Sequence, residues 1–196
     1  MENVNPNAQT IENSLKEILK YIGEDPEREG LKDTPKRMMK MWLETMRGYD
    51  PKQKPKVTTF QNGIDGIIYD ELIVDNGNYY SNCEHHFVPF FGQYWFAYIP
   101  HPQGKILGLS KVARVVDYYC AKLQIQERLC SDIIHALEKE LDCEYPPLGI
   151  GIIMKGEHLC KTMRGVKKQG AMTTSYLKGL LKTDHQARAE FLSLIK

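Results

Sequence analysis

The sequence carries no marked excess of either charge, because its 196 residues include 26 Lys and Arg against 25 Asp and Glu, a net charge of +1. General binding to nucleic acid or to an anionic membrane surface needs a strong positive excess, so this balance argues against both. No apolar run approaches the roughly 20 residues that a membrane-spanning helix needs, and the polar start of the chain predicts no secretory signal peptide. We therefore expect a soluble, cytoplasmic protein that binds neither nucleic acid nor membrane.

The cysteines lack the even number and regular spacing of a disulfide framework. There are five of them: Cys83, Cys120, Cys130, Cys143 and Cys160. We expect their thiols to be reduced. Apolar residues make up 42% of the chain and charged residues 26%, which are the proportions of a globular protein. The length fits one domain of ordinary size with a small N-terminal appendage.

Helical periodicity dominates the start of the chain. Apolar residues recur at helical spacing over residues 11–22. A second helix is predicted to begin at Asp33 or Thr34 and to end at Gly48. Pro35 falls in its first turn, where the missing N–H costs no hydrogen bond.

A loose tail is predicted over residues 1–8, and a linker rich in Pro and Lys over residues 50–57. The sequence becomes richer in strand-forming residues from Val57 onward. We therefore divide the chain into residues 1–56, which hold the tail, a helical hairpin and the linker, and residues 57–196, which form a larger domain.

This larger domain alternates between extended and helical patterns. Extended segments are predicted over 67–74, broken by 75–78, and a strand or a hairpin turning near Gly92 is predicted over 87–99. The later elements are helices over 110–123 and 129–141, strands over 148–154 and 170–177, and a closing helix over 187–195. The simplest assembly is an α+β domain with an antiparallel sheet and helices on one face.

Two clusters combine thiol and imidazole groups, the ligands that zinc prefers. They are Cys83-Glu84-His85-His86 and His158-Leu159-Cys160. Cys160 lies 74 positions after His86, a distance that excludes zinc-finger spacing and favours a site that the fold assembles. The alternative is a half-buried thiol beside surface imidazoles, with no metal.

The spacing suggests which of these residues converge. If the strand that begins at residue 148 continues to Cys160, then His158 and Cys160 face the same side. A catalytic zinc typically has three protein ligands and a fourth position left for water. Here the three candidate ligands are Cys83, His86 and Cys160. His85 and His158 would then be candidates for acid–base chemistry. The alternative is that either histidine is a further ligand or merely an ordered neighbour.

Cationic residues gather at the start of a predicted helix. Ser110 is predicted to cap it, Lys111 lies in its first turn, and Arg114 follows three residues later. Cations there oppose the helix dipole unless an anion binds, although solvated surface side chains would give the same pattern. A second basic run holds Lys161, Arg164, Lys167 and Lys168. In a chain of neutral balance, such clusters favour a small polyanion such as a nucleotide phosphate.

Gln126 and Glu127 fall at the start of another predicted helix. A carboxylate there has two readings. It can be a helix-dipole residue, or it can accept two hydrogen bonds from the ring N–H and amino group of guanine. The sequence leaves both open.

Taken together, and in this order, the motifs resemble the GTP cyclohydrolase I family from about Asp25 to the C-terminus. The residues that carry the resemblance are 29–37 (EGLKDTPKR), 83–86 (CEHH), 108–111 (GLSK), 124–129 (QIQERL), 158–160 (HLC) and 163–165 (MRG). The resemblance implies the tunnelling fold, an antiparallel four-stranded sheet with two helices, preceded by an N-terminal helical hairpin. It also implies that residues 57–196 form the catalytic domain and that the chain assembles as a homodecamer, a dimer of pentamers, with active sites at subunit interfaces.

The same resemblance implies a role for each matching residue. Zinc is held by Cys83, His86 and Cys160. His158 is the acid–base group, with His85 beside the reacting ring, and Glu127 anchors guanine with Gln126 next to it. The triphosphate is contacted by Ser110, Lys111, Arg114 and Arg164, and by Arg37 of an adjacent subunit. Met172 departs from the family pattern, since many relatives carry Thr in that stretch.

The implied reaction is zinc-dependent hydrolysis of GTP at C8 of guanine, with release of formate and rearrangement to 7,8-dihydroneopterin triphosphate. This is the first step of folate or tetrahydrobiopterin synthesis, and allosteric regulation is left open. Three alternatives remain. They are another tunnelling-fold enzyme, such as a pyruvoyl-tetrahydropterin synthase relative with a three-histidine zinc site, a non-catalytic zinc-stabilised nucleotide-binding scaffold, and a metal-free domain.

Overall fold

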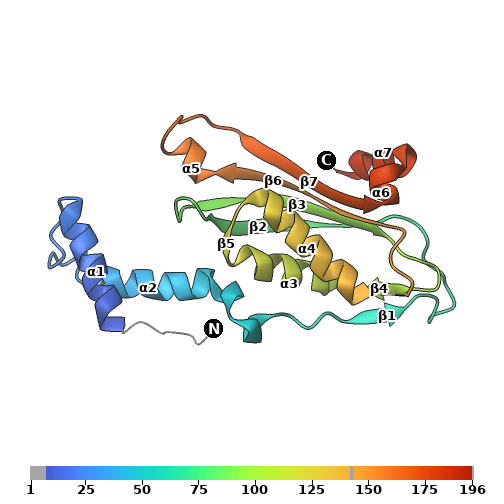
Figure 1. The fold of residues 1–196 in the computed structure, drawn as a ribbon, viewed down its shortest axis with the longest axis horizontal. Coiled ribbons are helices and arrows are strands. Elements are labelled where there is room, and N and C mark those ends of the chain that lie inside the picture. Colours follow the sequence, from blue (N-terminus) through green and yellow to red (C-terminus); the bar gives the residue numbers. More distant parts are fainter. Residues whose placement is uncertain (1–7, 142–143, 196) are drawn as a thin grey trace. The chain divides into compact units, whose positions relative to one another are not determined.

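A computed structural model describes residues 8–141 and 144–195, and its contacts divide the chain into two units, Met1–Met46 and Arg47–Lys196. The first unit contains helices α1 (Ala8–Tyr21) and α2 (Thr34–Thr45), which contact each other (Figure 1). Both predicted helices are confirmed. The tail expected over residues 1–8 lies outside the described residues except for Ala8, as does Cys143. The domain boundary between residues 56 and 57 stays a prediction.

Helix α2 ends at Thr45 and does not reach Gly48. Pro35 lies in its first turn as predicted, and Asp33 precedes the helix without a capping hydrogen bond from its side chain. Gly48 belongs to the short 3-10 turn η1 (Arg47–Tyr49), where its N–H donates to the carbonyl of Ala121. A Cβ at this position would come within 2.3 Å of the Tyr118 carbonyl oxygen. The glycine is therefore needed for packing against the end of a later helix.

The larger unit is built on a five-stranded sheet in the order β5-β2-β3-β6-β7. Each of its long strands is antiparallel to the long strand beside it: β2 (Ile73–Cys83), β3 (Pro89–Ile99), β6 (Gly149–His158) and β7 (Ala171–Gly179). The short β5 (Leu123–Gln124) pairs in parallel with the end of β2. A second 3-10 turn, η2 (Pro51–Gln53), and a separate two-stranded ladder of β1 (Thr59–Gln61) and β4 (Lys105–Leu107) complete the strand-rich part. The mixed α+β class is confirmed.

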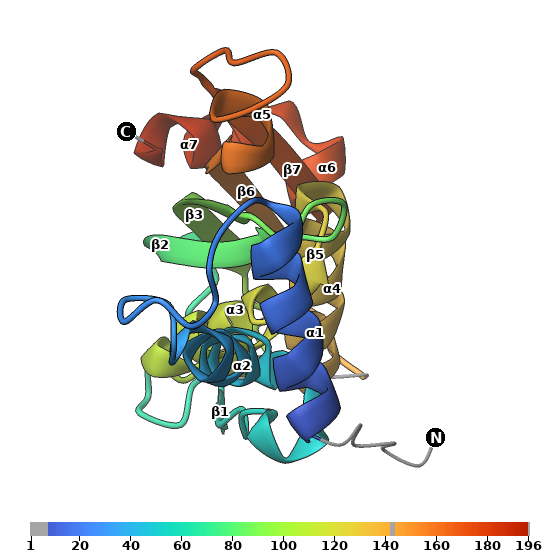
Figure 2. The same cartoon turned by 90° about the vertical axis from the view of Figure 1, so that its left-hand side faces the viewer.

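Helices α3 (Leu109–Cys120) and α4 (Gln126–Leu141) cover one face of the sheet (Figures 1 and 2). Their buried apolar side chains pack against inward residues of the strands, among them Phe90, Phe96 and Ile152. The prediction of helices on one face only is wrong. Two C-terminal helices, α6 (Leu180–Thr183) and α7 (His185–Leu194), pack on the other face. There Leu181 and Phe191 are buried against Trp95, because β3 presents apolar side chains to both faces of the sheet.

Two predicted interruptions of the strands are wrong. Residues 75–78 lie inside β2 and are fully paired with β3. The Tyr94 ring packs against Gly77, and a Cβ at this position would lie only 3.0 Å from the ring. Gly92 makes no turn either, because it pairs with Gly156 across β3 and β6, where a Cβ would lie 1.9 Å from the Lys155 carbonyl oxygen. Both glycines permit close approach within a continuous sheet.

The extended segment predicted over 67–74 begins later in the structure than the sequence indicates. Ile67 and Ile68 lie exposed in a loop, and the strand begins only at Ile73. Leu123, predicted as the end of a helix, lies in β5. Ser110 does not cap α3, since the N-cap position is Gly108 and no side chain caps this helix. In the described ranges no helix combines the length and the apolar character that crossing a membrane requires.

Candidate active site

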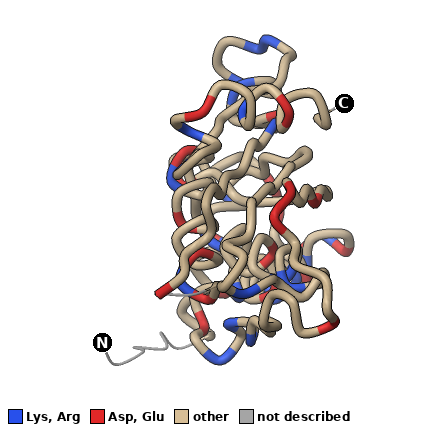
Figure 3. The backbone as a smooth tube through the Cα atoms, turned by 90° about the vertical axis from the view of Figure 1, so that its right-hand side faces the viewer, with Lys and Arg blue, Asp and Glu red and all other residues tan. Residues whose placement is uncertain are grey.

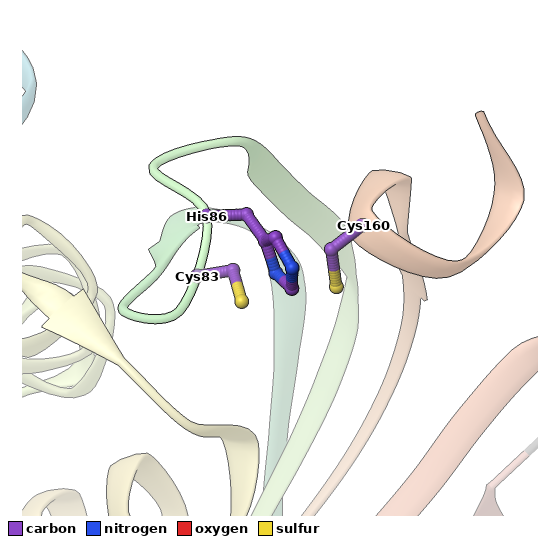
Figure 4. A group of neighbouring side chains, drawn as sticks. All are labelled: Cys83, His86 and Cys160. Carbon is purple, nitrogen blue, oxygen red and sulfur yellow. The ribbon is translucent and has the colours of Figure 1, made fainter. Parts of the chain in front are cut away.

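Three ligand-type side chains converge at one end of the sheet (Figure 4). One ligand atom each from Cys83, His86 and Cys160 lies within 4.8 Å of the others. Cys83 is the last residue of β2, and its backbone closes the turn to β3 through hydrogen bonds with Phe87 and Val88. This turn, and not Gly92, reverses the chain between β2 and β3, and it carries His86.

Cys160 reaches the group by a route that the sequence did not predict. Strand β6 ends at His158, and the chain continues as a single helical turn, α5 (Leu159–Thr162). The condition under which His158 and Cys160 would face the same side, a strand that continues from residue 148 to Cys160, is therefore not met. The helical turn directs the Cys160 thiol toward Cys83 and His86 (Figure 4).

The donor set fits a divalent metal ion of the zinc type. Two sulfur atoms and one imidazole nitrogen are ligands that zinc accepts, and three protein ligands leave a coordination position open. Burial, together with the neighbouring Cys83 thiol, raises the pKa of Cys160. A cation between these groups would offset that shift, because it stabilises the thiolate form.

His158 lies next to this group and is held from two sides. Its ring stacks on Phe90 with 4.5 Å between centroids and 5° between planes. Its Nε2 lies 2.9 Å from Oε1 of Gln126. Burial lowers the pKa of His158, so the neutral ring is favoured over the imidazolium.

Gln126 is 1% exposed, and both polar atoms of its side-chain amide bond within the protein. Its Nε2 donates to the carbonyls of Met154 and Met172 and to the Thr174 hydroxyl, at 2.9–3.1 Å. Carbonyl oxygens accept only, so they fix which end of the amide is nitrogen. Oε1 must then face Tyr79 and His158, and both donate to it. His158 therefore carries a proton on Nε2, and Nδ1 is the nitrogen that can exchange one.

A cavity of about 310 Å³ opens beside these residues. Its lining comes from the turn, β5, the start of α4, β6, α5 and β7: Cys83, His85, Gln124, Ile125, Gln126, Glu127, His158, Cys160 and Met172. Glu127 lies exposed in the first turn of α4. His85 is exposed, with Nδ1 3.7 Å from the Cys83 sulfur. Thiols, histidines and a carboxylate thus face one space.

Arg164 lies at this end of the larger unit, in the same basic segment as Lys161 of α5. Its Nη1 donates to Nε2 of His86 at 3.0 Å. It belongs to the segment after α5, where Figure 3 shows a group of Lys and Arg residues. Elsewhere along the chain positive and negative residues are interspersed (Figure 3).

The other predicted cations do not join the cavity within this chain. Ser110, Lys111 and Arg114 lie in the first turns of α3, which follows β4 at the far end of the sheet (Figure 1). The C-terminal end of α3 is the part that approaches the site, where the Tyr119 carbonyl accepts a hydrogen bond from Nε2 of Gln124 at 3.2 Å and the Cys120 carbonyl accepts one from the Ser81 hydroxyl. A rise of 1.5 Å per residue places Ser110 about 15 Å along the helix from there.

Arg114 instead lines a separate cavity of about 250 Å³ together with Arg47, Asp117 and Tyr118. Arg37 belongs to the smaller unit, where its Nη2 donates to the Gly30 carbonyl and the Thr34 hydroxyl.

The sequence analysis assigned no role to several residues around the site, namely Tyr79, Phe90, Gln124, Ile125 and Arg128. In the sequence, Tyr79 and Phe90 look like ordinary inward-facing residues of strands, and nothing in their spacing indicates a position beside the site. Ile125 and Arg128 stand within the 124–129 motif, so proximity to Glu127 was the available hint.

Comparison with known proteins agrees with this geometry. The model of the family described as GTP cyclohydrolase I matches residues 11–196. The chain is 45% identical over 189 residues to GTP cyclohydrolase 1 of Leptospira biflexa, covering 95% of this chain and 98% of that protein. It is 46% identical to GTP cyclohydrolase 1 of a Geobacillus species over 193 residues and of Bacillus pumilus over 194, with 97% of each chain covered in both cases.

A solved structure, the archaeosine synthase QueF-Like in the apo form, covers 55% of this chain and 93% of its own, with a TM-score of 0.43 and 15% identity. That likeness is too distant to support an argument about fold or function. The family match and the three relatives each span nearly the whole chain. On these matches, the chain belongs to the GTP cyclohydrolase I family and is an enzyme of its hydrolase class.

Proposed function

We propose that this enzyme opens the guanine imidazole ring of GTP at C8 in a zinc-dependent reaction, releases formate and forms 7,8-dihydroneopterin triphosphate. The reaction would be the first step of pterin synthesis, toward folate or tetrahydrobiopterin. One observation carries the proposal: Cys83 and Cys160, two members of the ligand group, line the same cavity as His158 and Glu127. Cytoplasmic localisation stays a prediction.

We assign the metal to Cys83, His86 and Cys160. When bound there, zinc would supply Lewis-acid activation of a water molecule. The ligand group contains one histidine and two cysteines, which disfavours the three-histidine alternative. The tunnelling fold is proposed for the larger unit, supported by its four long antiparallel strands and by the two helices α3 and α4 between β3 and β6.

His158 is proposed as the group that passes a proton to and from the guanine ring, through Nδ1. This follows from the hydrogen bond to Gln126, which occupies Nε2. Burial lowers the pKa of His158, so a protonated ring gives up its proton readily. Glu127 is proposed to accept hydrogen bonds from the guanine N1–H and amino group, and His85 to lie beside the reacting ring.

The triphosphate is proposed to lie between copies of the chain. One copy offers Arg164 near its cavity, whereas Ser110, Lys111 and Arg114 lie at the far end of the sheet. A second copy that places its α3 start against this cavity would complete a cationic site, and Arg37 would come from an adjacent subunit. This incompleteness supports interfacial sites in a homodecamer made of two pentamers.

The test is incubation of metal-replete protein with GTP. We expect formate and a neopterin that fluoresces after oxidation, in equal amounts. Binding of GTP without formate release would instead support the nucleotide-binding scaffold. Absence of tightly bound metal from freshly purified protein would support the metal-free domain.

A further inference from the structure

Arg128 joins three elements next to residues that line the active-site cavity, and with Glu84 it lines a neighbouring cavity of about 400 Å³. Its Nη2 lies 2.5 Å from Oε2 of Glu84 and also donates to the Leu123 carbonyl at 3.1 Å. Its Nε donates to Oε1 of Gln124 at 3.0 Å. Arg128 directly follows Glu127 in the first turns of α4. One guanidinium therefore links the start of α4, strand β5 and the turn after β2.

Glu84 is the point at which this link reaches the ligand group. It directly follows Cys83 and lies two residues before His86. Its backbone N–H donates to the Gln124 carbonyl at 3.1 Å, and its second carboxylate oxygen lies 3.9 Å from Nε2 of His85. Its side chain is thus placed between Arg128 and the exposed part of the turn.

Other hydrogen bonds also reach the turn, from the Glu84 N–H to the Gln124 carbonyl and from Arg164 Nη1 to Nε2 of His86. His85, His86 and Phe87 are all exposed, and the hydrogen bonds of Cys83 to Phe87 and Val88 act only within the turn itself. A planar guanidinium that bonds to a carboxylate and two further acceptors restricts orientation more than a point charge does. Arg128 therefore adds a side-chain restraint to the backbone pairing between β2 and β5, and this restraint acts on the separation between the turn and Glu127.

We propose that Arg128 is a positioning residue that holds the metal-binding turn at a fixed distance from the start of α4 by its ion pair with Glu84. The inference rests on the proposed metal site. It assigns to Arg128 no contact with GTP or metal. Its consequence is that loss of either partner loosens His86 relative to Cys83 and Cys160, and so weakens metal binding.

A merely structural role is distinguishable because the pair is accessible to solvent. The Arg128 and Glu84 side chains are 43% and 32% exposed, and exposed ion pairs contribute little to the free energy of unfolding. The pair between Lys178 and Glu138 offers a matched control. It also joins α4 to a neighbouring strand, with side chains 36% and 27% exposed, and neither residue lines the cavity.

The experiment measures the affinity of the full-length protein for Co²⁺ by competition with a chelator, and the thiolate-to-cobalt absorption of the complex. Arg128→Gln and Glu84→Gln are each expected to weaken Co²⁺ binding by about tenfold, as loss of an outer contact to a metal site does. The double variant should lose no more than either single variant. Arg128→Lys should fall between wild type and Arg128→Gln, and Glu138→Gln should bind Co²⁺ as wild type does. The thermal midpoint of every metal-free variant should stay near that of wild type.

Unchanged Co²⁺ affinity in both single variants would overturn the proposal, as would additive effects in the double variant or an equal loss in Glu138→Gln. If Arg128→Gln does not fold, Glu84→Gln with its smaller change decides alone. A wild-type protein that binds no Co²⁺ would overturn this inference together with the proposed metal site. Wild-type binding with unaffected variants would overturn the inference and leave the proposed function standing.

Discussion

His158 and Gln126 are joined by a hydrogen bond of 2.9 Å between Nε2 and Oε1. The residue resemblance grouped Gln126 with the substrate contacts, yet its amide is buried and fully used by the protein. The geometry favours a role in which Gln126 orients His158. Phe90 stacks on the face of the His158 ring. The stacking restrains the plane of the ring, and the hydrogen bond to Gln126 fixes its orientation within that plane before substrate binds.

Gln126→Glu is expected to destabilise the protein and to lower the turnover number. A carboxylate oxygen would replace the nitrogen that donates to the Met154 and Met172 carbonyls and would face them without a proton to share, at a cost of about 1–3 kcal/mol. Urea unfolding would measure the loss. Gln186→Glu on α7, where the side chain is exposed, is the control and should leave stability nearly unchanged. Equal stability of both variants would contradict the buried network.

His158→Ala and Cys160→Ser separate chemistry from metal binding. The first removes the proposed proton-transfer group and should abolish formate release while zinc content stays near normal. The second removes a proposed ligand and should lower zinc content itself. Metal analysis of purified protein, beside the formate assay, checks both. Loss of metal in His158→Ala with retention in Cys160→Ser would reverse the two assignments.

A mixture of two inactive variants should regain activity if the site lies between subunits. Lys111→Ala damages the cationic start of α3, and His158→Ala damages the cavity at the opposite end of the sheet. In randomly mixed oligomers, about a quarter of interfacial sites would receive both intact halves. The measurement is GTP turnover after co-refolding or co-expression. No regain above the separate variants would show that each site is complete within one chain.

Removal of metal should lower thermal stability as well as abolish activity. A ligand that binds only the folded state stabilises it by about 2.7 kcal/mol when its concentration is a hundred times its dissociation constant. Thermal unfolding with added chelator and then with added Zn²⁺ would measure the shift. Cys83→Ser should show little response to Zn²⁺, because it lacks one proposed ligand. An equal shift in that variant would place the stabilising ion elsewhere.

Asp75 and Asp65 should make the stability of the fold depend on pH in opposite directions. Burial raises the pKa of Asp75, so its ionised form disfavours folding, and stability is lost as the pH rises through the folded pKa. Asp75→Asn should therefore raise the urea midpoint near neutral pH and give no gain below the ordinary carboxyl pKa of about 3.9.

Asp65 serves as the comparison, because the hydroxyl of Tyr69 donates to it and lowers its pKa. Its ionised form favours folding, so that stability is present above the unfolded pKa and lost as the pH falls. Asp65→Asn should lower the urea midpoint near neutral pH. The same sign of change in both variants would contradict these two environments.

The helices were predictable because their signal is local. The apolar periodicity of α1, α2, α3 and α4 depends on neighbours three and four residues apart. The strands were less predictable. Residues 75–78 resemble a turn by composition, and only the pairing of β2 with β3 along its full length overrides that preference.

The sequence by itself determined the chemistry available here: two thiols, three histidines and one carboxylate in motifs whose residue types point to a metal and a purine. Only the tertiary structure decided their arrangement. The amide of Gln126 is oriented by carbonyls 28 and 46 residues away, and the ion pair of Arg128 spans 44 residues. The direction of α3 carries Lys111 away from the cavity. Such relationships depend on which strands and helices pack together, and no local spacing encodes them.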